Sequence, residues 1–217
     1  MFVGHLAVAF AAKRAKPEVS LAWTVSAVLF VDLLWPVLLL LGVERVAISP
    51  GITAFTPLYF LHYPWSHSLL MGVVWGLLLA AFARSCGVRR DALPMLAALV
   101  VSHWLLDLVT HRPDLPLWPW GSHLYGLGLW NSVVGSFAVE TTLWVGGLAL
   151  WLSAYRPRGA SGWTALLSFV LVSTAIWAMG PFSPAPPSER AIAIFSLLGF
   201  SAIPWASWVD RSATRRG

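Results

Sequence analysis

The stretch SHWLLDLVTHRPDLP (102–116) carries three groups capable of chemistry within an apolar run. His103, Asp107 and His111 follow one another at steps of four among Leu, Val and Trp residues. On a helix this spacing stacks the three side chains on one face. Burying such groups in an apolar setting costs free energy unless something compensates them. The stretch therefore predicts a helix whose polar face meets a partner inside the protein.

Other ionisable residues in apolar segments are few: His5, Asp32, His67 and Glu140. The interiors of the long apolar stretches contain no Lys or Arg, so we expect these carboxylates to have no basic side chain at their own depth. A buried carboxylate without such a partner must be protonated, hydrogen-bonded or neutralised by a bound cation.

Mixed His and carboxylate ligands suit Zn²⁺ or Mn²⁺. A metal site with an open position lowers the pKa of bound water and supplies hydroxide near neutral pH, and a pair of ions can hold both oxygens of a phosphoryl transfer. We expect one or two ions, with Asp32 or Asp107 as the carboxylate that takes the proton. The candidate ligands are His5, Asp32, His67, His103, Asp107, His111 and Glu140.

Composition indicates an integral membrane protein. Of the 217 residues, 58% are hydrophobic and 11% charged, whereas soluble domains carry roughly 25% charged residues. The fourteen Trp residues agree, because Trp gathers at membrane interfaces. The net charge of +5 then reflects topology and does not predict a nucleic-acid partner. A single cysteine, Cys86, excludes an intrachain disulfide.

The apolar segments predict an all-α fold: one polytopic bundle over 1–217 with six spanning helices, each of about 20 residues. The expected spans are 19–42, 66–84, 92–111, 132–154, 162–181 and 191–209. Residues 2–12 predict a helix of about 17 Å, too short to span alone. It either extends to Lys16 or is re-entrant, and in both cases carries His5 into the bundle. Basic residues follow this run, opposite to a cleaved signal peptide, so we expect it to be retained.

The distribution of basic residues predicts orientation. Segments 13–18, 84–91, 155–161 and 210–217 hold eleven Lys and Arg, whereas the alternate loops hold only Arg45, Arg112 and Arg190. By the positive-inside rule both ends of the six-span core face the cytoplasm. At 1.5 Å per residue Asp32 lies about 20 Å from the inner end of its span. We therefore expect the polar cluster in the outer half of the membrane, facing outward.

Several motifs resemble one family. GHLAVAF around His5, FVDLLWP around Asp32, WSHSLL around His67 and HWLLDLVTHRPDLPLWP from His103 resemble the YdjM-like membrane-bound metal-dependent hydrolases. The resemblance covers about residues 1–120, and the spanning helices within 132–217 are additional to it. It implies a hydrolase in the cytoplasmic membrane of a bacterium or archaeon.

The order of the ligands is also distantly similar to zinc-dependent phospholipase C, whose relatives cleave phosphoesters with a zinc cluster held on helices. In that comparison Glu140 matches the final acid, whereas Ser136 stands where those enzymes have His. The step from Asp107 to His111 is also shorter than in those enzymes, so a site of one or two metals is expected.

Further residues have a functional and an ordinary interpretation. Arg112 is a candidate to clamp a phosphate oxygen, or anchors a helix end at the headgroups. Ser68 is a candidate to donate to a bound phosphate, or caps a helix. His62 and His123 lie in loops and are expected to be solvated. The aromatic loops 48–65 and 115–130 either admit an amphiphilic substrate from the bilayer or pack the rim of the bundle.

The leading hypothesis is metal-dependent hydrolysis of a phosphoester of a lipid or lipid-linked molecule. Two alternatives stay open: transport of a divalent cation or proton, which requires polar residues such as Thr24 and Ser26 to continue the path inward, and a scaffold whose metal only joins helices. The sequence leaves the substrate and the oligomeric state open.

Overall fold

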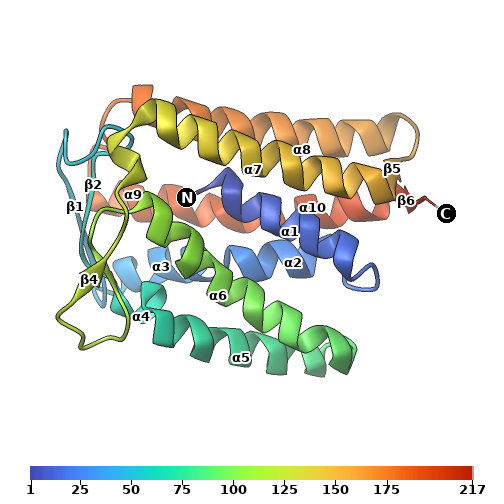
Figure 1. The fold of residues 1–217 in the computed structure, drawn as a ribbon, viewed down its shortest axis with the longest axis horizontal. Helices are drawn as coiled ribbons and strands as arrows, with labels where there is room; N and C mark the ends of the chain where they lie inside the picture. The colour runs from blue at the N-terminus through green and yellow to red at the C-terminus, as the bar shows by residue number, and fades with distance from the viewer. Residues whose placement is uncertain (217) are drawn as a thin grey trace.

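The computed structural model describes residues 1–216, most of them in helices that run roughly along one long axis (Figure 1). The α-helices are α1 (Val3–Ala15), α2 (Leu21–Val28), α3 (Phe30–Leu40), α4 (Pro64–His67), α5 (Leu69–Ser85), α6 (Leu93–Thr110), α7 (Val133–Ala154), α8 (Gly159–Met179), α9 (Glu189–Ser196) and α10 (Ala202–Arg211). Short 3₁₀ segments are η1 (Arg90–Ala92), η2 (Leu129–Asn131), η3 (Gly180–Phe182) and η4 (Leu197–Ser201). The strands β1 (Arg45–Ile48) with β2 (Leu58–His62), β3 (Leu115–Pro116) with β4 (Leu124–Tyr125), and β5 (Tyr155–Pro157) with β6 (Ala213–Arg215) form antiparallel pairs.

The prediction of six spans plus a short helix is wrong, although the helical class agrees with an all-α membrane bundle. Within residues 1–216, four segments are long and apolar enough to cross a membrane, and the bent pair α2–α3 makes a fifth if it counts as one span. These four are Arg90–Thr110, Val133–Ala154, Gly159–Phe182 and Glu189–Arg211. Helix α5 has 17 residues and α1 has 13, and a span needs about 20.

Local backbone chemistry explains two of these differences. The predicted span 19–42 bends by 51° between α2 and α3, at Leu29, which lies outside the ideal helical region at φ −97° and ψ 1°. The predicted span 66–84 splits because Ser68 is extended and its Oγ accepts from the N–H of Met71, capping α5. His67 therefore lies on the separate turn α4 and not on the long helix.

Helix α1 lies inside the bundle, between α7 on one side and α2 and α6 on the other (Figure 1). Its residues Val3 and Phe10 are fully buried in the main apolar core. Gly147 of α7 faces it so closely that a Cβ there would collide with the backbone of Ala7. This enclosure brings His5 into the interior at 0% exposure, as predicted, and α1 ends at Ala15, one residue before the predicted Lys16.

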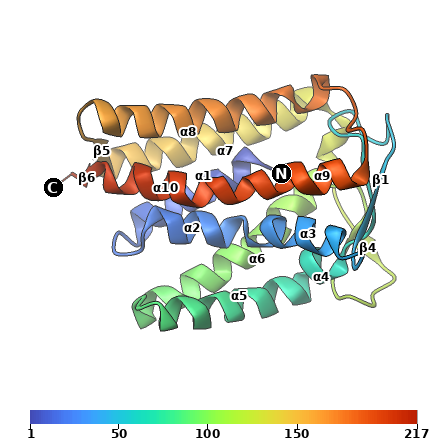
Figure 2. The ribbon, with the colours of Figure 1, turned by 180° about the vertical axis from the view of Figure 1, so that it is seen from behind.

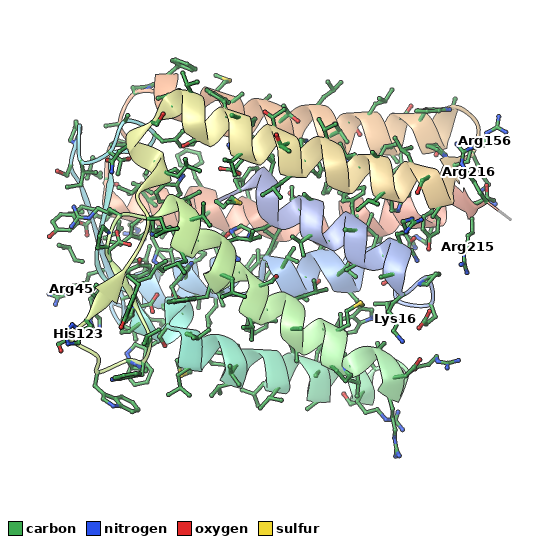
Figure 3. All side chains as sticks on the ribbon, in the orientation of Figure 1. Lys16, Arg45, His123, Arg156, Arg215 and Arg216 are labelled. Carbon is green, nitrogen blue, oxygen red and sulfur yellow. The ribbon has the colours of Figure 1, made fainter. Side chains whose placement is uncertain are left out.

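Charged groups separate to the two ends of the molecule. Lys16, Arg156, Arg215 and Arg216 lie at one end, and Arg45 and His123 lie at the other (Figure 3). The basic end also contains a buried ion pair, in which Lys13 Nζ lies 3.0 Å from Asp210 Oδ1 and donates to the carbonyl oxygens of Pro17 and Val19. The separation that the sequence pattern predicts is therefore present in the folded chain.

Candidate metal centre

His5, His103 and Asp107 form the first group of buried ligand atoms. Nε2 of His103 lies 3.1 Å from Oδ2 of Asp107, and Nε2 of His5 lies 3.1 Å from Oδ1 of the same carboxylate. The two imidazole rings stack with centroids 3.7 Å apart. Helices α1 and α6 thus place three potential metal ligands within reach of one ion.

Asp32, His67 and His103 form a second group that shares His103 with the first. Asp32 Oδ1 lies 3.4 Å from Nε2 of His67 and 3.5 Å from Nε2 of His103. The Asp32 side chain is 36% exposed, whereas those of His67 and His103 are 5% and 2% exposed. Because one imidazole nitrogen binds one ion, His103 can serve only one of the two groups.

The nitrogen of His103 that faces away from the cluster shows which nitrogen is available for a ligand. Its Nδ1 lies 2.7 Å from the carbonyl oxygen of Val28, which only accepts. Nδ1 therefore carries a proton, and in neutral His103 the lone pair of Nε2 faces Asp32 and Asp107. Among residues 1–216, no group forms a hydrogen bond of acceptable geometry with this buried Nε2. A lone pair facing two carboxylates is stabilised only by a cation, either a proton or a metal ion, between them.

His67 is oriented by a chain of hydrogen bonds from a buried acid in the loop after α3. Ser66 donates its N–H to Oε1 of Glu44 at 2.8 Å and its hydroxyl to Oε2 at 2.7 Å. The Ser66 oxygen is thereby left to accept from Nδ1 of His67, 2.7 Å away. Burial raises the pKa of the Glu44 carboxyl, and the hydrogen bonds from Ser66 oppose this rise. The chain leaves Nε2 of His67 as the free nitrogen, directed at Asp32.

His111 has a similar arrangement at the C-terminal end of α6. Its Nδ1 lies 3.0 Å from Oδ1 of Asp114, which also accepts from the Tyr63 hydroxyl at 2.8 Å. Burial and then the charge of Asp114 hold the pKa of Tyr63 well above its ordinary value, so its hydroxyl stays a donor. Nε2 of His111 lies 3.7 Å from Oδ2 of Asp107. His111 thus faces the cluster without belonging to either three-residue group.

The prediction that the acids lack a basic partner is wrong for Asp107. The α-amino group of Met1 lies 2.6 Å from its Oδ1 and 3.2 Å from Oγ1 of Thr110. Counting side chains missed this partner because the amine belongs to the backbone. Asp32 keeps the predicted property, since its ion-pair partners among the described residues are only His67 and His103.

Glu140 lies apart from the two ligand groups and contacts the start of α1. Its Oε2 accepts from the N–H groups of Phe2 at 2.8 Å and Gly4 at 3.2 Å. This is the favourable place for a carboxylate, because the first N–H groups of a helix lack intrahelical partners. In this structure Glu140 therefore positions α1, and through it His5, and belongs to neither ligand group.

The two predicted substrate-binding residues also have other contacts. Ser68 Oγ accepts from Met71 N–H as a helix cap. Arg112 lies over the ring of Tyr59 at 4.6 Å, with its Nε 3.7 Å from Asp114. The capping interpretation of Ser68 describes its contact, the contacts of Arg112 were in neither of its interpretations, and His62 and His123 are exposed as expected.

Sequence reasoning missed Glu44, Ser66, Tyr63 and Asp114, which hold the outward-facing nitrogens of the histidines. Two signals were present: Ser66 precedes His67 directly, and Asp114 follows His111 by three residues. Glu44 carried no such signal, because only the folded loop brings it to Ser66. Second partners of this kind fix the ring orientation and raise the basicity of ligating histidines.

Comparisons with protein-family models, with curated proteins and with solved structures give no match for this chain. The resemblance to the YdjM-like hydrolases therefore stays a prediction from the motifs. The donor set itself fits a divalent ion: imidazole nitrogens of His67 and His103 whose second nitrogens are already hydrogen-bonded, a nitrogen of His5, and carboxylates at the same point. The described residues offer such ligands in two overlapping groups.

Proposed function

We propose that this chain is a membrane-embedded, metal-dependent hydrolase of phosphoesters, acting on a lipid or lipid-linked substrate. Zn²⁺ or Mn²⁺, as one or two ions, would be held by His5, Asp32, His67, His103 and Asp107. The proposed location is the cytoplasmic membrane of a bacterium or archaeon, with the basic end of the bundle in the cytoplasm and the cluster in the outer half.

One observation carries the proposal: Nε2 of His67 and Nε2 of His103 converge on Asp32 and Asp107 while their Nδ1 atoms are hydrogen-bonded elsewhere, and Nε2 of His5 meets Asp107 from α1. His103 uses Val28, and His67 uses Ser66 backed by Glu44. With Nδ1 already donating, each Nε2 needs a cation between itself and the carboxylates, either a second proton on the ring or a metal ion. A divalent cation satisfies these nitrogens and the carboxylates together.

The two carboxylates are suited to different roles. A bound divalent ion would supply an acidified water and stabilise charge on a phosphoryl oxygen. Asp32 is partly exposed to a cavity and has only imidazole ion-pair partners among the described residues, so it is placed to take the proton from an attacking water. Asp107 is 2% exposed and surrounded by His5, His103 and the Met1 amine, so it is placed to hold the cluster together.

The transport alternative receives less support from the inner half of the bundle. It needs polar groups that continue from the cluster, and the Thr24 hydroxyl is buried and donates to the Leu21 carbonyl of its own helix. The neighbouring core residues Leu21, Val25 and Val28 are apolar and fully buried. The exposed side of Asp32 favours an open site over a saturated metal staple.

The experiment is a panel of phosphomonoesters and phosphodiesters, including phospholipids, assayed with the purified full chain in detergent and in vesicles. We expect hydrolysis that requires Zn²⁺ or Mn²⁺, and its loss in His103→Ala and Asp107→Ala. His123→Ala, an exposed loop histidine, is the matched control and should keep full activity. Hydrolysis at the unaltered rate by a metal-free double variant would refute the proposal.

A further inference from the structure

An apolar cavity reaches Asp32 from the side of the bundle. It has a volume of about 380 Å³ and lies between α3, α8 and the last helical segment. Asp32 is the only charged residue among the described residues that line it. Its other walls include Leu29, Leu33 and Trp35. This volume is at the low end of the roughly 300–1,000 Å³ typical of ligand sites. A cavity of this size favours a single hydrocarbon chain over a bulky group.

The mouth of the cavity lies on a surface that faces lipid in a spanning bundle. Ile176 of α8 and Phe195 of α9 line it and are 61% and 65% exposed. Both belong to segments apolar enough to cross a membrane. Figure 2 shows α9 alongside α3, and next to α9 the 3₁₀ segment η4 contacts α3. A 3₁₀ stretch within a span marks a local departure from regular packing, and here it forms one wall of the cavity.

Aromatic residues cover the cluster from the loop end. The rings of Phe60 and Trp130 lie 5.0 and 4.3 Å from that of His111. Tyr63 is bonded to Asp114 beneath them, and His111 and Tyr63 are 3% and 2% exposed. The two aromatic loops thus form a cover over this end, and Asp32 is reached from the lateral cavity.

We propose that this cavity admits the single hydrocarbon chain of an amphiphilic phosphoester directly from the bilayer and places its headgroup at Asp32. The chemistry at the headgroup rests on the proposed function. The cavity adds the route of entry from the bilayer and the class of substrate, an amphiphile with a single hydrocarbon chain. The occupant is a lipid chain because the walls are apolar and the mouth opens among exposed apolar side chains. An anionic headgroup beside Asp32 requires the divalent cation, so binding of the whole amphiphile is metal-dependent.

Gly199 of η4 determines how much of the cavity is open. A Cβ at this position would lie 3.3 Å from a methyl carbon of Leu33, across the cavity wall. A leucine side chain at position 199 would project farther and fill the space that the chain occupies. Gly146 of α7 supplies a matched control, because a Cβ there meets nothing within 4 Å.

The test uses hexadecyl phosphate with a photoreactive diazirine at the far end of its chain, added with Zn²⁺ to the full protein in nanodiscs. Cross-linked residues are then mapped by mass spectrometry. We expect cross-links on α8 and α9, suppressed by unlabelled hexadecyl phosphate and by chelation of the metal. They should be lost in Gly199→Leu and retained in Gly146→Leu. Ser196→Leu, which narrows the same wall, gives a second variant should Gly199→Leu not fold.

Two results would overturn the inference: cross-links spread over the whole lipid-facing surface, or equal competition by hexadecanol, which indicates ordinary bilayer lipid. Retention of the mapped cross-links in both folded cavity variants would do the same. Failure of the proposed function is distinguishable from these results. A chain that cross-links hexadecyl phosphate at α8 and α9 but hydrolyses no member of the phosphoester panel would refute the hydrolase and leave the route. A soluble phosphoester hydrolysed without any mapped chain site would do the reverse.

Discussion

The hydrogen bonds at Nδ1 of His103, His67 and His111 determine what their Nε2 atoms can bind. A neutral imidazole has one donor and one acceptor nitrogen, so a partner at Nδ1 determines what Nε2 offers. Val28, Ser66 and Asp114 supply those partners for His103, His67 and His111. Such partners are typical of ligating histidines, and here they come from three different elements.

Glu44→Gln tests this arrangement without touching a proposed ligand. Ser66 donates to both oxygens of the Glu44 carboxylate, and in glutamine one of these two atoms becomes an NH₂ group that cannot accept, so one of the two hydrogen bonds is lost. We expect divalent-metal affinity to fall about 10- to 100-fold, the usual effect of losing such a partner. The measurement is Zn²⁺ titration against a competing chelator. Glu189→Gln, an exposed acid near the same surface, should leave affinity unchanged, and unchanged affinity in Glu44→Gln would contradict the orienting role.

At the scale of elements, α1 carries His5 into the interior only because Gly147 of α7 lets the two helices pack closely. Gly147→Ala would drive a methyl group into the backbone of Ala7. We expect a loss of about 1–3 kcal/mol of stability, as for other overpacked sites, together with weaker metal binding as α1 moves. Thermal unfolding in detergent measures the first effect. The adjacent Gly146→Ala has open space around it and should be neutral, so equal effects of the two substitutions would exclude close packing as the cause.

The basic end of the bundle depends on one buried charge pair. Asp210 pairs with Lys13 and accepts from the N–H of Leu21 at the start of α2. We expect Asp210→Ala to cost about 3 kcal/mol, because it leaves a buried ammonium without its anion. Asp91→Ala removes an exposed pair with Arg89 and should leave stability almost unchanged, because water screens a pair of this kind. Chemical unfolding curves that show equal losses would count against a buried pair at Lys13.

The sequence predicted which segments are helical better than it predicted where a helix is interrupted. Apolar length and basic flanks suffice to place α6, α7 and α8 near their observed bounds. The breaks at Leu29 and Ser68 depend on backbone conformation and a side-chain cap, which an average over hydropathy does not detect. The same limit applies to the site: His103 and Asp107 follow from helical spacing, whereas the contact of Ser66 with Glu44 spans 22 positions and requires the folded loop.

For the whole molecule, the separation of charge predicts orientation. Cys86 is the single cysteine, is exposed, and follows α5 within the basic segment 84–91. We expect an impermeant maleimide to label it only after the cytoplasmic membrane is permeabilised. In the variant Cys86→Ser with His123→Cys, labelling should occur in intact spheroplasts. The reverse pattern would contradict the proposed orientation and place the cluster toward the cytoplasm.

The central claim is that Asp32, His67 and His103, with Asp107 and His5, capture a divalent cation. The most direct measurement is elemental analysis of the purified full chain together with His103→Ala and the loop control His123→Ala. We predict one or two equivalents of zinc or manganese in the unaltered chain and in His123→Ala, and a loss of bound metal in a folded His103→Ala. A chain that contains no divalent metal after purification and binds none on titration, with the cluster intact, would contradict the claim.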